Sequence, residues 1–325
     1  MKLALLFLIF LSVSTYETAC ISEDDDRDLE RQVQMMTKSP MKTFVTKEGD
    51  TIDCVEINKQ PALDHPLLKN HKIQVVSLRD DMTENIKYGG YGITNIYNLT
   101  IAHDQVSSHN MWIETGPPDH ISMIAAGWQV SPQLYGDSRP RLFTYWTGNG
   151  YRNGCYNMLC PGFVQIHRSI TPGYIFDRAS TYGGRQFEFF IQIFQDPSKK
   201  NWWLTVGNEG VTIGYWPSEL FLYLRDGALH TAWGGVGVAG RDGVCPPMGS
   251  GHKPDGSYSH AEYFRQLNWI DAKGDFQRPS TKTTEWVDKS KVYDLKNYRH
   301  VKFHKFDYWI SFGGPGGYCE GGRAG

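Results

Sequence analysis

The stretch Phe187-Glu188-Phe189-Phe190-Ile191-Gln192-Ile193-Phe194-Gln195 decides the fold class. Polar residues alternate with apolar residues along it, as they do in a β-strand that has one buried face. Residues 196–201 read Asp-Pro-Ser-Lys-Lys-Asn, a composition typical of a turn. The apolar run from Trp202 to Val206 follows and can return beside the first strand. The sequence therefore predicts a β-hairpin in this part of the chain.

The rest of the chain after Tyr88 has the same character. Short apolar stretches are separated by glycine and proline, and the 325 residues include 34 Gly and 14% aromatic residues, which favours strands and turns over a helical bundle. Strands are expected at 97–102, 111–114, 121–130, 141–147, 163–167, 212–216, 232–238, 263–270 and 306–312, and a short helix at Ser218 to Arg225. The predicted fold is all-β, an antiparallel two-sheet β-sandwich of jelly-roll type.

The first twenty residues have the pattern of a secretory signal peptide. Lys2 precedes an apolar run of 11 residues, Leu3 to Val13, and small residues follow as far as Ala19. The run is shorter than the roughly 20 residues that cross a bilayer, so we expect an exported, soluble mature protein. A buried N-terminal strand is the alternative. The formal net charge of −2 gives no reason to expect a nucleic acid or a membrane as partner.

Six cysteines and one glycosylation signal agree with export. Cys155 and Cys160 flank four residues, so a bridge between them would clamp a short loop. Asn98-Leu99-Thr100 is the only N-glycosylation sequon, and we expect a glycan on Asn98.

The segment from Gly49 to Gln74 precedes the main domain and contains Pro61 and Pro66. Each proline forces extended backbone on the residue before it. An extended, partly apolar segment in this position suits a pro-segment that lies in a groove. An inter-domain linker explains the same residues equally well.

Several motifs resemble, in the same order, those of the neprosin family of secreted plant peptidases. Residues 53–74 are similar to the activation peptide of that family. The domain motifs are A-G-W-Q-V-S-P-Q-L-Y-G-D at 126–137, R-L-F-T-Y-W-T at 141–147, G-C-Y-N-M-L-C-P-G-F-V-Q at 154–165, D-P-S-K-K-N-W-W-L at 196–204, G-Y-W-P-S-E-L-F at 214–221, P-M-G-S-G-H at 247–252 and G-G-P-G-G-Y-C at 313–319.

The resemblance implies a signal peptide at 1–20, an activation-peptide-like pro-segment at 21–80 and a catalytic-type β-sandwich domain at 81–325. It also implies a location outside the cell, in the cell wall or apoplast, or in the vacuole. Active family members are glutamic endopeptidases that cut beside proline at acidic pH. This chemistry uses two carboxylates near one water and no cofactor or metal.

Both glutamate positions of the family are replaced in this chain. The family motifs I-E-A-G-W-Q-V and W-G-G-E read Ile-Ala-Ala-Gly-Trp-Gln-Val and Trp-Gly-Gly-Val here, so the glutamates fall on Ala125 and Val236. Neither side chain can hold a proton or activate a water. The resemblance therefore implies a peptidase scaffold without its catalytic pair. Glu114, on the strand expected before that of Ala125, is a weak substitute, and an exposed strand-end carboxylate is the plainer interpretation.

A second departure concerns the disulfides. The family often has a cysteine at the position of Val292, which pairs with the cysteine of the closing motif, here Cys319. Cys245 lies outside the family pattern, and we expect a Cys245–Cys319 bridge in its place.

Other kinds of site find no support in the sequence. His103, His109 and His120 do not have the spacing of a zinc motif, and surface or structural roles explain them better. The chain has no G-x-S-x-G nucleophile motif and no P-loop.

Aromatic residues in the matched segments suggest what the scaffold binds. They can form the sandwich core or an apolar groove for proline-rich chains, which are already extended. The candidates are Trp128, Tyr145, Trp146, Trp202, Trp203, Tyr215 and Trp216. We expect a degenerate glutamic peptidase that binds extended, proline-rich polypeptide, and the pro-segment of the chain is a second expected ligand. The alternatives are an active peptidase that uses other acids, and a carbohydrate-binding wall protein.

Overall fold

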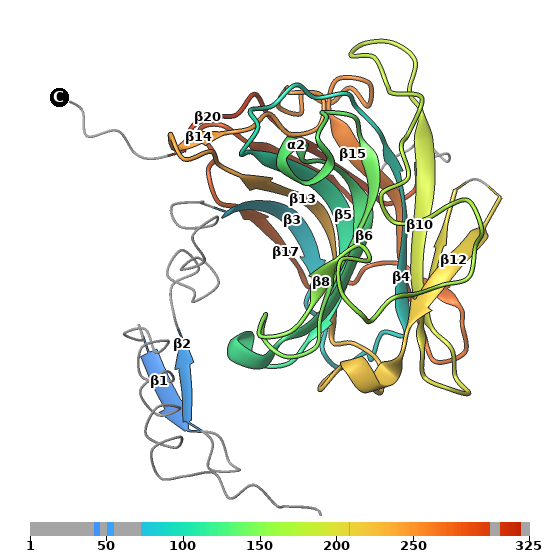
Figure 1. The fold of residues 1–325 in the computed structure, drawn as a ribbon. Coiled ribbons are helices and arrows are strands. Elements are labelled where there is room, and N and C mark those ends of the chain that lie inside the picture. Colours follow the sequence, from blue (N-terminus) through green and yellow to red (C-terminus); the bar gives the residue numbers. More distant parts are fainter. Residues whose placement is uncertain (1–41, 46–50, 55–72, 208, 300–305, 320–325) are drawn as a thin grey trace, which may run out of the picture. The chain divides into compact units, whose positions relative to one another are not determined.

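The computed structural model describes residues 42–45, 51–54, 73–207, 209–299 and 306–319 (Figure 1). Strands β1 (Lys42–Val45) and β2 (Thr51–Cys54) form an antiparallel pair of their own. No helix in the described part of the chain is long and apolar enough to cross a membrane. The predicted signal peptide, Cys20, and Pro61 and Pro66 lie outside the described residues.

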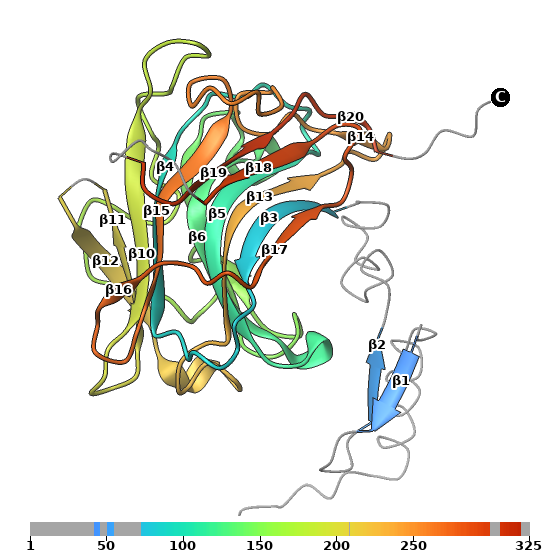
Figure 2. The same cartoon turned by 180° about the vertical axis from the view of Figure 1, so that it is seen from behind.

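The described residues from Ile73 onward form two antiparallel sheets packed face to face (Figures 1 and 2). The seven-stranded sheet has the order β17 (Thr283–Val287), β3 (Ile73–Asp80), β13 (His230–Val238), β5 (Val106–Thr115), β6 (Ser122–Val130), β7 (Arg141–Thr147) and β8 (Cys155–Tyr156). The predicted two-sheet β-sandwich is confirmed, and Figure 1 shows that the seven-stranded sheet is strongly bent.

The nine-stranded sheet is the second layer. Its order is β18 (Asp294–Tyr298), β19 (Trp309–Gly313), β15 (Glu262–Ile270), β4 (Gly89–Asn95), β10 (Glu188–Gln195), β11 (Trp202–Val206), β12 (Val211–Trp216) and β9 (Val164–Gln165), with β16 (Phe276–Gln277) paired to β15. The remaining elements are the pair β14 (Val244–Cys245) and β20 (Gly317–Tyr318), the helix α2 (Pro132–Tyr135) and the 3-10 turns η3 (Pro118–His120) and η4 (Ser218–Leu220). The predicted hairpin at 187–206 is the pair β10–β11.

The core between the sheets follows from the alternation of side chains along each strand. Trp128, Trp202, Trp216 and Trp233 are fully buried there, together with the apolar residues of β10 that alternate with Gln192. Complete burial of large apolar side chains is the main favourable contribution to folding.

Three sequence expectations differ from the structure. Residues 97–102 form no strand, because this segment makes only an isolated bridge from Tyr97 to Ser180. The helix expected at 218–225 is the short turn η4, and the backbone becomes extended at Phe221, which is buried in the core. The sandwich begins at Ile73, earlier than the boundary predicted at residue 80, because β3 lies between β17 and β13.

Both expected disulfides are present. Cys155 pairs with Cys160 and Cys245 pairs with Cys319. The second bridge joins the strand pair β14–β20 and links positions 74 residues apart in the sequence. Cross-linking a long loop stabilises a domain mainly by restricting the unfolded chain.

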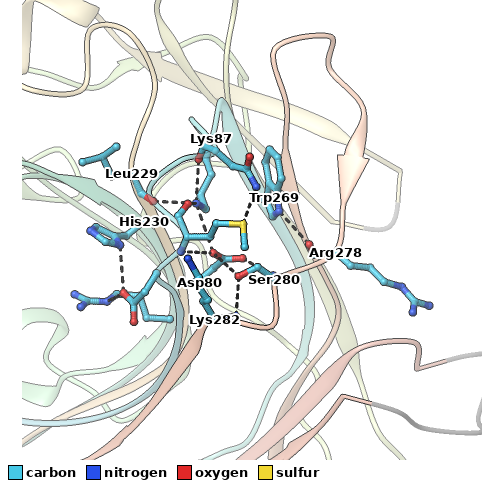
Figure 3. Close-up of polar contacts among 12 residues, drawn as sticks. Asp80, Lys87, Leu229, His230, Trp269, Arg278, Ser280 and Lys282 are labelled. Atoms are coloured by element: carbon cyan, nitrogen blue, oxygen red, sulfur yellow. Dashed lines mark hydrogen bonds and ion pairs between the residues drawn. The ribbon is translucent and has the colours of Figure 1, made fainter.

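A fully buried ion pair connects the two sheets at one end of the sandwich (Figure 3). Lys87 Nζ, just before β4, donates to the carbonyl oxygens of Met82 (2.8 Å), Asn85 (3.1 Å) and Leu229 (2.9 Å) and lies 3.6 Å from Asp80 Oδ1. Asp80, at the end of β3, also accepts the backbone N–H of Ser280 at 2.7 Å. These bonds satisfy both charges and hold the start of β4 against the ends of β3 and β13.

A second polar cluster lies deeper in the core, at Trp128. The His109 ring stacks on Trp128 with a centroid distance of 3.9 Å, and the Trp128 indole N–H lies 3.2 Å from Glu262 Oε1. Thr94 donates to the same oxygen at 2.7 Å. Burial lowers the pKa of His109 to about 3 and raises the pKa of Glu262 well above its ordinary value. The fold therefore favours the neutral form of each side chain.

These two groups predict opposite slopes of stability with pH. His109 stabilises fully above its ordinary pKa of 6.5, and this contribution is lost as the pH falls towards 3. Glu262 stabilises fully below its ordinary pKa of 4.5, and this contribution is lost as the pH rises through its raised folded value. Urea unfolding of Glu262→Gln should show a gain over wild type that grows above pH 4.5 by about 1.4 kcal/mol per pH unit. If the gain in unfolding free energy of Glu262→Gln did not change with pH, the raised pKa of Glu262 would be contradicted. His109→Gln should instead reduce the loss of unfolding free energy that the wild-type protein shows as the pH falls below 6.5.

Candidate functional site

The outer face of the seven-stranded sheet, turned away from the core, carries both positions at which the sequence lacks the expected acids. Ala125 on β6 lies opposite Trp112 on β5, and Trp112 lies opposite Ala232 on β13. The three side chains pack as one cluster, separate from the core between the sheets. The same cross-strand row continues to Arg79 on one side of the sheet. On the other side it continues to Tyr145 and Tyr156.

Val236 shares this face with Ala125 but does not lie opposite it. Its cross-strand partners are Ser108 on β5 and, beyond it, Gln129 on β6. Val236 is therefore offset from the row of Ala125 by four residues, about 13 Å along the strands. The position that the register places across Trp112 from Ala125 is Ala232, which the sequence alone did not single out.

Glu114 lies one step along the same face, two residues from Trp112 on β5. Its partners across the sheet are Met123 and His230. Its carboxylate is paired with Arg79, whose Nη1 lies 3.1 Å from Glu114 Oε1. One oxygen of the Glu114 carboxylate is therefore engaged by the Arg79 guanidinium and is not free to bind a water.

Asp81 and His230 complete a charged network around Arg79. Arg79 Nε donates to Asp81 Oδ1 at 2.6 Å, and His230 Nδ1 lies 3.3 Å from the same oxygen. Burial lowers the pKa of Arg79, but Glu114 and Asp81 outweigh this effect and raise it above the ordinary value. Burial and Arg79 lower the pKa of His230. Its imidazole therefore favours the neutral form, which can accept a proton but is a weaker base than an ordinary histidine, and Arg79 pairs with both carboxylates of the network.

Tyrosine rings form the opposite end of the row. The ring centroid of Tyr145 lies 4.9 Å from that of Tyr156 and 6.4 Å from that of Tyr151. Tyr156 and Tyr151 are about half exposed, at 48% and 43%. Burial of the hydroxyl groups raises the pKa of Tyr145 and of Tyr151, so both phenols stay protonated and can donate hydrogen bonds.

The aromatic residues expected to line one groove separate into three places. Trp128, Trp146, Trp202 and Trp216 are buried in the core, because their strands turn these side chains inward. Trp203 and Tyr215 lie on the nine-stranded sheet, on the face turned away from the core. Tyr145 alone is on the face of Ala125. Four of the seven aromatic residues thus have the core role that the sequence left open, and the other three lie on two different faces.

Other candidate residues have ordinary surroundings. His109 is buried in the core, and His120 Nδ1 lies 2.6 Å from Asn149 Oδ1. Among the residues that the structure describes, no three His, Cys, Asp or Glu side chains are grouped so that they could hold a metal ion. Asn98 and Thr100 of the glycosylation sequon are both exposed.

Comparison with known proteins gives two family matches. The family described as Neprosin matches residues 103–315, and the family described as Neprosin activation peptide matches residues 43–122. Among solved structures, scytalido-glutamic peptidase with a transition state analog inhibitor is similar over 74% of this chain and 98% of its own, with 10% identity and a TM-score of 0.42. SCP-B, a member of the Eqolisin family of peptidases in a complex with the tripeptide Ala-Ile-His, is similar over 74% and 96%, with 10% identity and a TM-score of 0.37.

Proposed function

The chain belongs to the neprosin family, and we propose that it binds extended, proline-rich polypeptide on the outer face of its seven-stranded sheet without cleaving it. The observation that carries this proposal is the row Ala125–Trp112–Ala232. Glutamic peptidases need two carboxylates beside one water, and here a methyl group stands on each side of Trp112. Without a proton acceptor at either position, bound peptide has no route to hydrolysis through this row.

The chemistry of the face supports proline-rich peptide as the ligand class. Tyr151 and Tyr156 offer exposed aromatic surface next to Tyr145, and Trp112, Ala125 and Ala232 form a buried apolar cluster packed against Tyr145. Proline-rich chains are already extended in solution, so they lose little conformational entropy when they dock on aromatic surfaces. Protonated phenols and Asn110, on the same strand as Trp112, can donate hydrogen bonds to the peptide carbonyls that proline leaves without a local partner.

An active peptidase that uses Glu114 is the second candidate. Glu114 is favoured by its place on the same face and opposed by its ion pair with Arg79 at 3.1 Å. The binding experiment below distinguishes the two, because it follows the peptide itself.

We also propose that the protein is exported, to the cell wall, the apoplast or the vacuole. The signal-like N-terminus, the two disulfides and the exposed sequon at Asn98 support export. Because self-cleavage is unavailable without the acid pair, the activation-peptide region stays attached unless another protease removes it. While it remains attached, the activation-peptide region competes with added peptide for the binding face. The mass of the protein recovered from the secretory route shows whether the signal peptide and the activation-peptide region have been removed.

A fluorescent decaproline peptide is the probe for the binding site. We expect saturable binding by the purified protein and an intact peptide, by mass spectrometry, after incubation from pH 2 to pH 7. Trp112→Ala and, at less risk to the core, Tyr156→Ser should weaken binding about tenfold. Trp203→Ala, on the other sheet, is the matched control and should bind as wild type does.

Two outcomes would overturn this function. Binding that both face variants leave unchanged, or no binding at all, excludes the outer face as the peptide site. Cleaved peptide would instead establish an active peptidase, and Glu114→Gln would then show whether Glu114 is the base.

A further inference from the structure

The nine-stranded sheet has an outer face of its own, on the far side of the molecule from β3 and β13 (Figure 2). Along β10, Ile191 and Ile193 point into the core, so Phe190, Gln192 and Phe194 point outward. This face is distinct from the face that carries Ala125, and the two sheets separate them.

One cross-strand row on this face is apolar and mostly aromatic. Phe194 on β10 lies opposite Trp203 on β11, Trp203 lies opposite Tyr215 on β12, and Tyr215 lies opposite Val164 on β9. The rings of Trp203 and Tyr215 are in contact, with a centroid distance of 4.7 Å. Val164 is 38% exposed, and the three aromatic side chains are half-buried. The row therefore presents a continuous apolar strip at the surface.

The adjacent row is polar and carries no charge. It consists of Thr212, Thr205, Gln192, Tyr91 and Asn268 on five consecutive strands. The hydroxyl groups of Thr205 and Thr212 are 3.1 Å apart. The ring centroid of Tyr91 lies 5.6 Å from that of Phe190 and 5.2 Å from that of Phe276. Successive outward residues on a strand are about 7 Å apart, so hydroxyl and amide groups border the aromatic strip along its length.

We propose that this face binds a neutral, β-1,4-linked polysaccharide chain. Sugar rings in such a chain present C–H groups on their flat faces, which pack on aromatic rings, and hydroxyl groups at their edges, which bond to amides and hydroxyls. The chain lies across the strands, because neighbouring strands are about 4.8 Å apart and a β-1,4-linked glycan advances by a similar distance per sugar.

The composition of the two rows favours an uncharged glycan, and the charged side chains of Asp196, beside Trp203, and Arg265, close enough to act on Tyr91, lie outside the rows. Neither row contains Lys, Arg, Asp or Glu. An uncharged surface is complementary to an uncharged chain, whereas a polyanionic chain would find no cation in either row to offset its desolvation. Asp196 lies at the border and accepts the Trp203 indole N–H at 3.2 Å, which fixes the orientation of that ring.

Isothermal titration of the full chain with cellohexaose tests the proposal. We expect saturable binding that Trp203→Ala weakens about tenfold, with little binding of maltohexaose or of oligogalacturonate. Tyr215→Ala is the second variant, should Trp203→Ala fail to fold as judged by circular dichroism. Trp286→Ala removes a tryptophan that is 55% exposed on the other sheet, and it is the matched control for both.

Three results would overturn the proposal. They are no binding of cellohexaose, binding that both row variants leave unchanged, and stronger binding of oligogalacturonate. A fourth result would come from light scattering. Self-association of the wild-type protein that Trp203→Ala abolishes would mean that this face is a contact between copies of the chain and not a glycan site. The decaproline assay reports on the other face, so failure here leaves the proposed peptide binding untouched.

Discussion

Replacing Ala125 and Ala232 together by glutamate is expected to give this protein peptidase activity at acidic pH. The two positions flank Trp112 in one cross-strand row, so two carboxylates placed there lie on the same face of the sheet, in a cluster that is buried in the native protein. At acidic pH one carboxyl stays protonated while its partner is ionised, which is the state that general acid–base catalysis needs. Cleavage of a proline-containing peptide, followed by mass spectrometry from pH 2 to pH 7, should rise at least about 100-fold above wild type.

The register also supplies the matched control for this experiment. Ala125→Glu/Val236→Glu puts the second acid at the position that the family motif indicates, but four residues from the row of Ala125. We expect this variant to remain inactive. Activity in the Val236 variant alone would show that the motif, and not the strand register, identifies the pair. If both double variants fold but cleave no peptide, two carboxylates at these positions are not sufficient for peptidase activity on this scaffold.

Removing the Lys87 ammonium group is expected to be the most destabilising single change considered for this protein. Lys87→Met leaves the Asp80 carboxylate buried without its counter-ion and leaves three backbone carbonyls without their donor. Breaking a buried ion pair in this way costs about 3–5 kcal/mol. Urea unfolding at neutral pH measures the loss.

Lys282 provides the comparison on the surface of the protein. Its ammonium group lies 3.2 Å from Glu84, and both side chains are more than 60% exposed, at 62% and 67%. Exposed pairs contribute about 0–1 kcal/mol, so Lys282→Met should change the free energy of unfolding little. Equal effects of the two variants would mean that the buried pair does not hold the sheets together.

The alternation of polar and apolar residues was sufficient to predict the fold class and most strands. In β10 it marks which side chains face the core, whereas β6 reads Ser-Met-Ile-Ala-Ala-Gly-Trp-Gln-Val and is buried along nearly its whole length. It failed at β4, which reads Gly-Gly-Tyr-Gly-Ile-Thr-Asn and lacks an apolar pattern. Gly90 is present there for a different reason. A Cβ on it would lie 2.4 Å from the terminal methyl of Met111 and 2.8 Å from Thr231 Cγ2 on the facing sheet, so a larger residue there would displace side chains of that sheet.

Strand register explains why only part of the candidate site was predicted. Ala232 and Val236 have the same parity on β13, so the sequence indicates that both face the same way. Which of them lies across from Ala125 depends on how β13 and β6 pair with β5, and local sequence does not determine that. The partners of Arg79 were missed for the same reason, because Glu114 is 35 residues away in the sequence.

The row Ala125–Trp112–Ala232 also bears on how such a chain evolves. Two ionisable groups on either side of one indole repel each other and lose hydration, so an active site of this kind costs the fold stability. The methyl groups of Ala125 and Ala232 carry no such cost and pack against the indole. If this chain has lost cleavage as proposed, folding favours apolar side chains at such positions once selection for cleavage is relaxed. A lineage that has taken this step would have to regain two separate glutamates, each of them destabilising, before selection could act on the restored reaction.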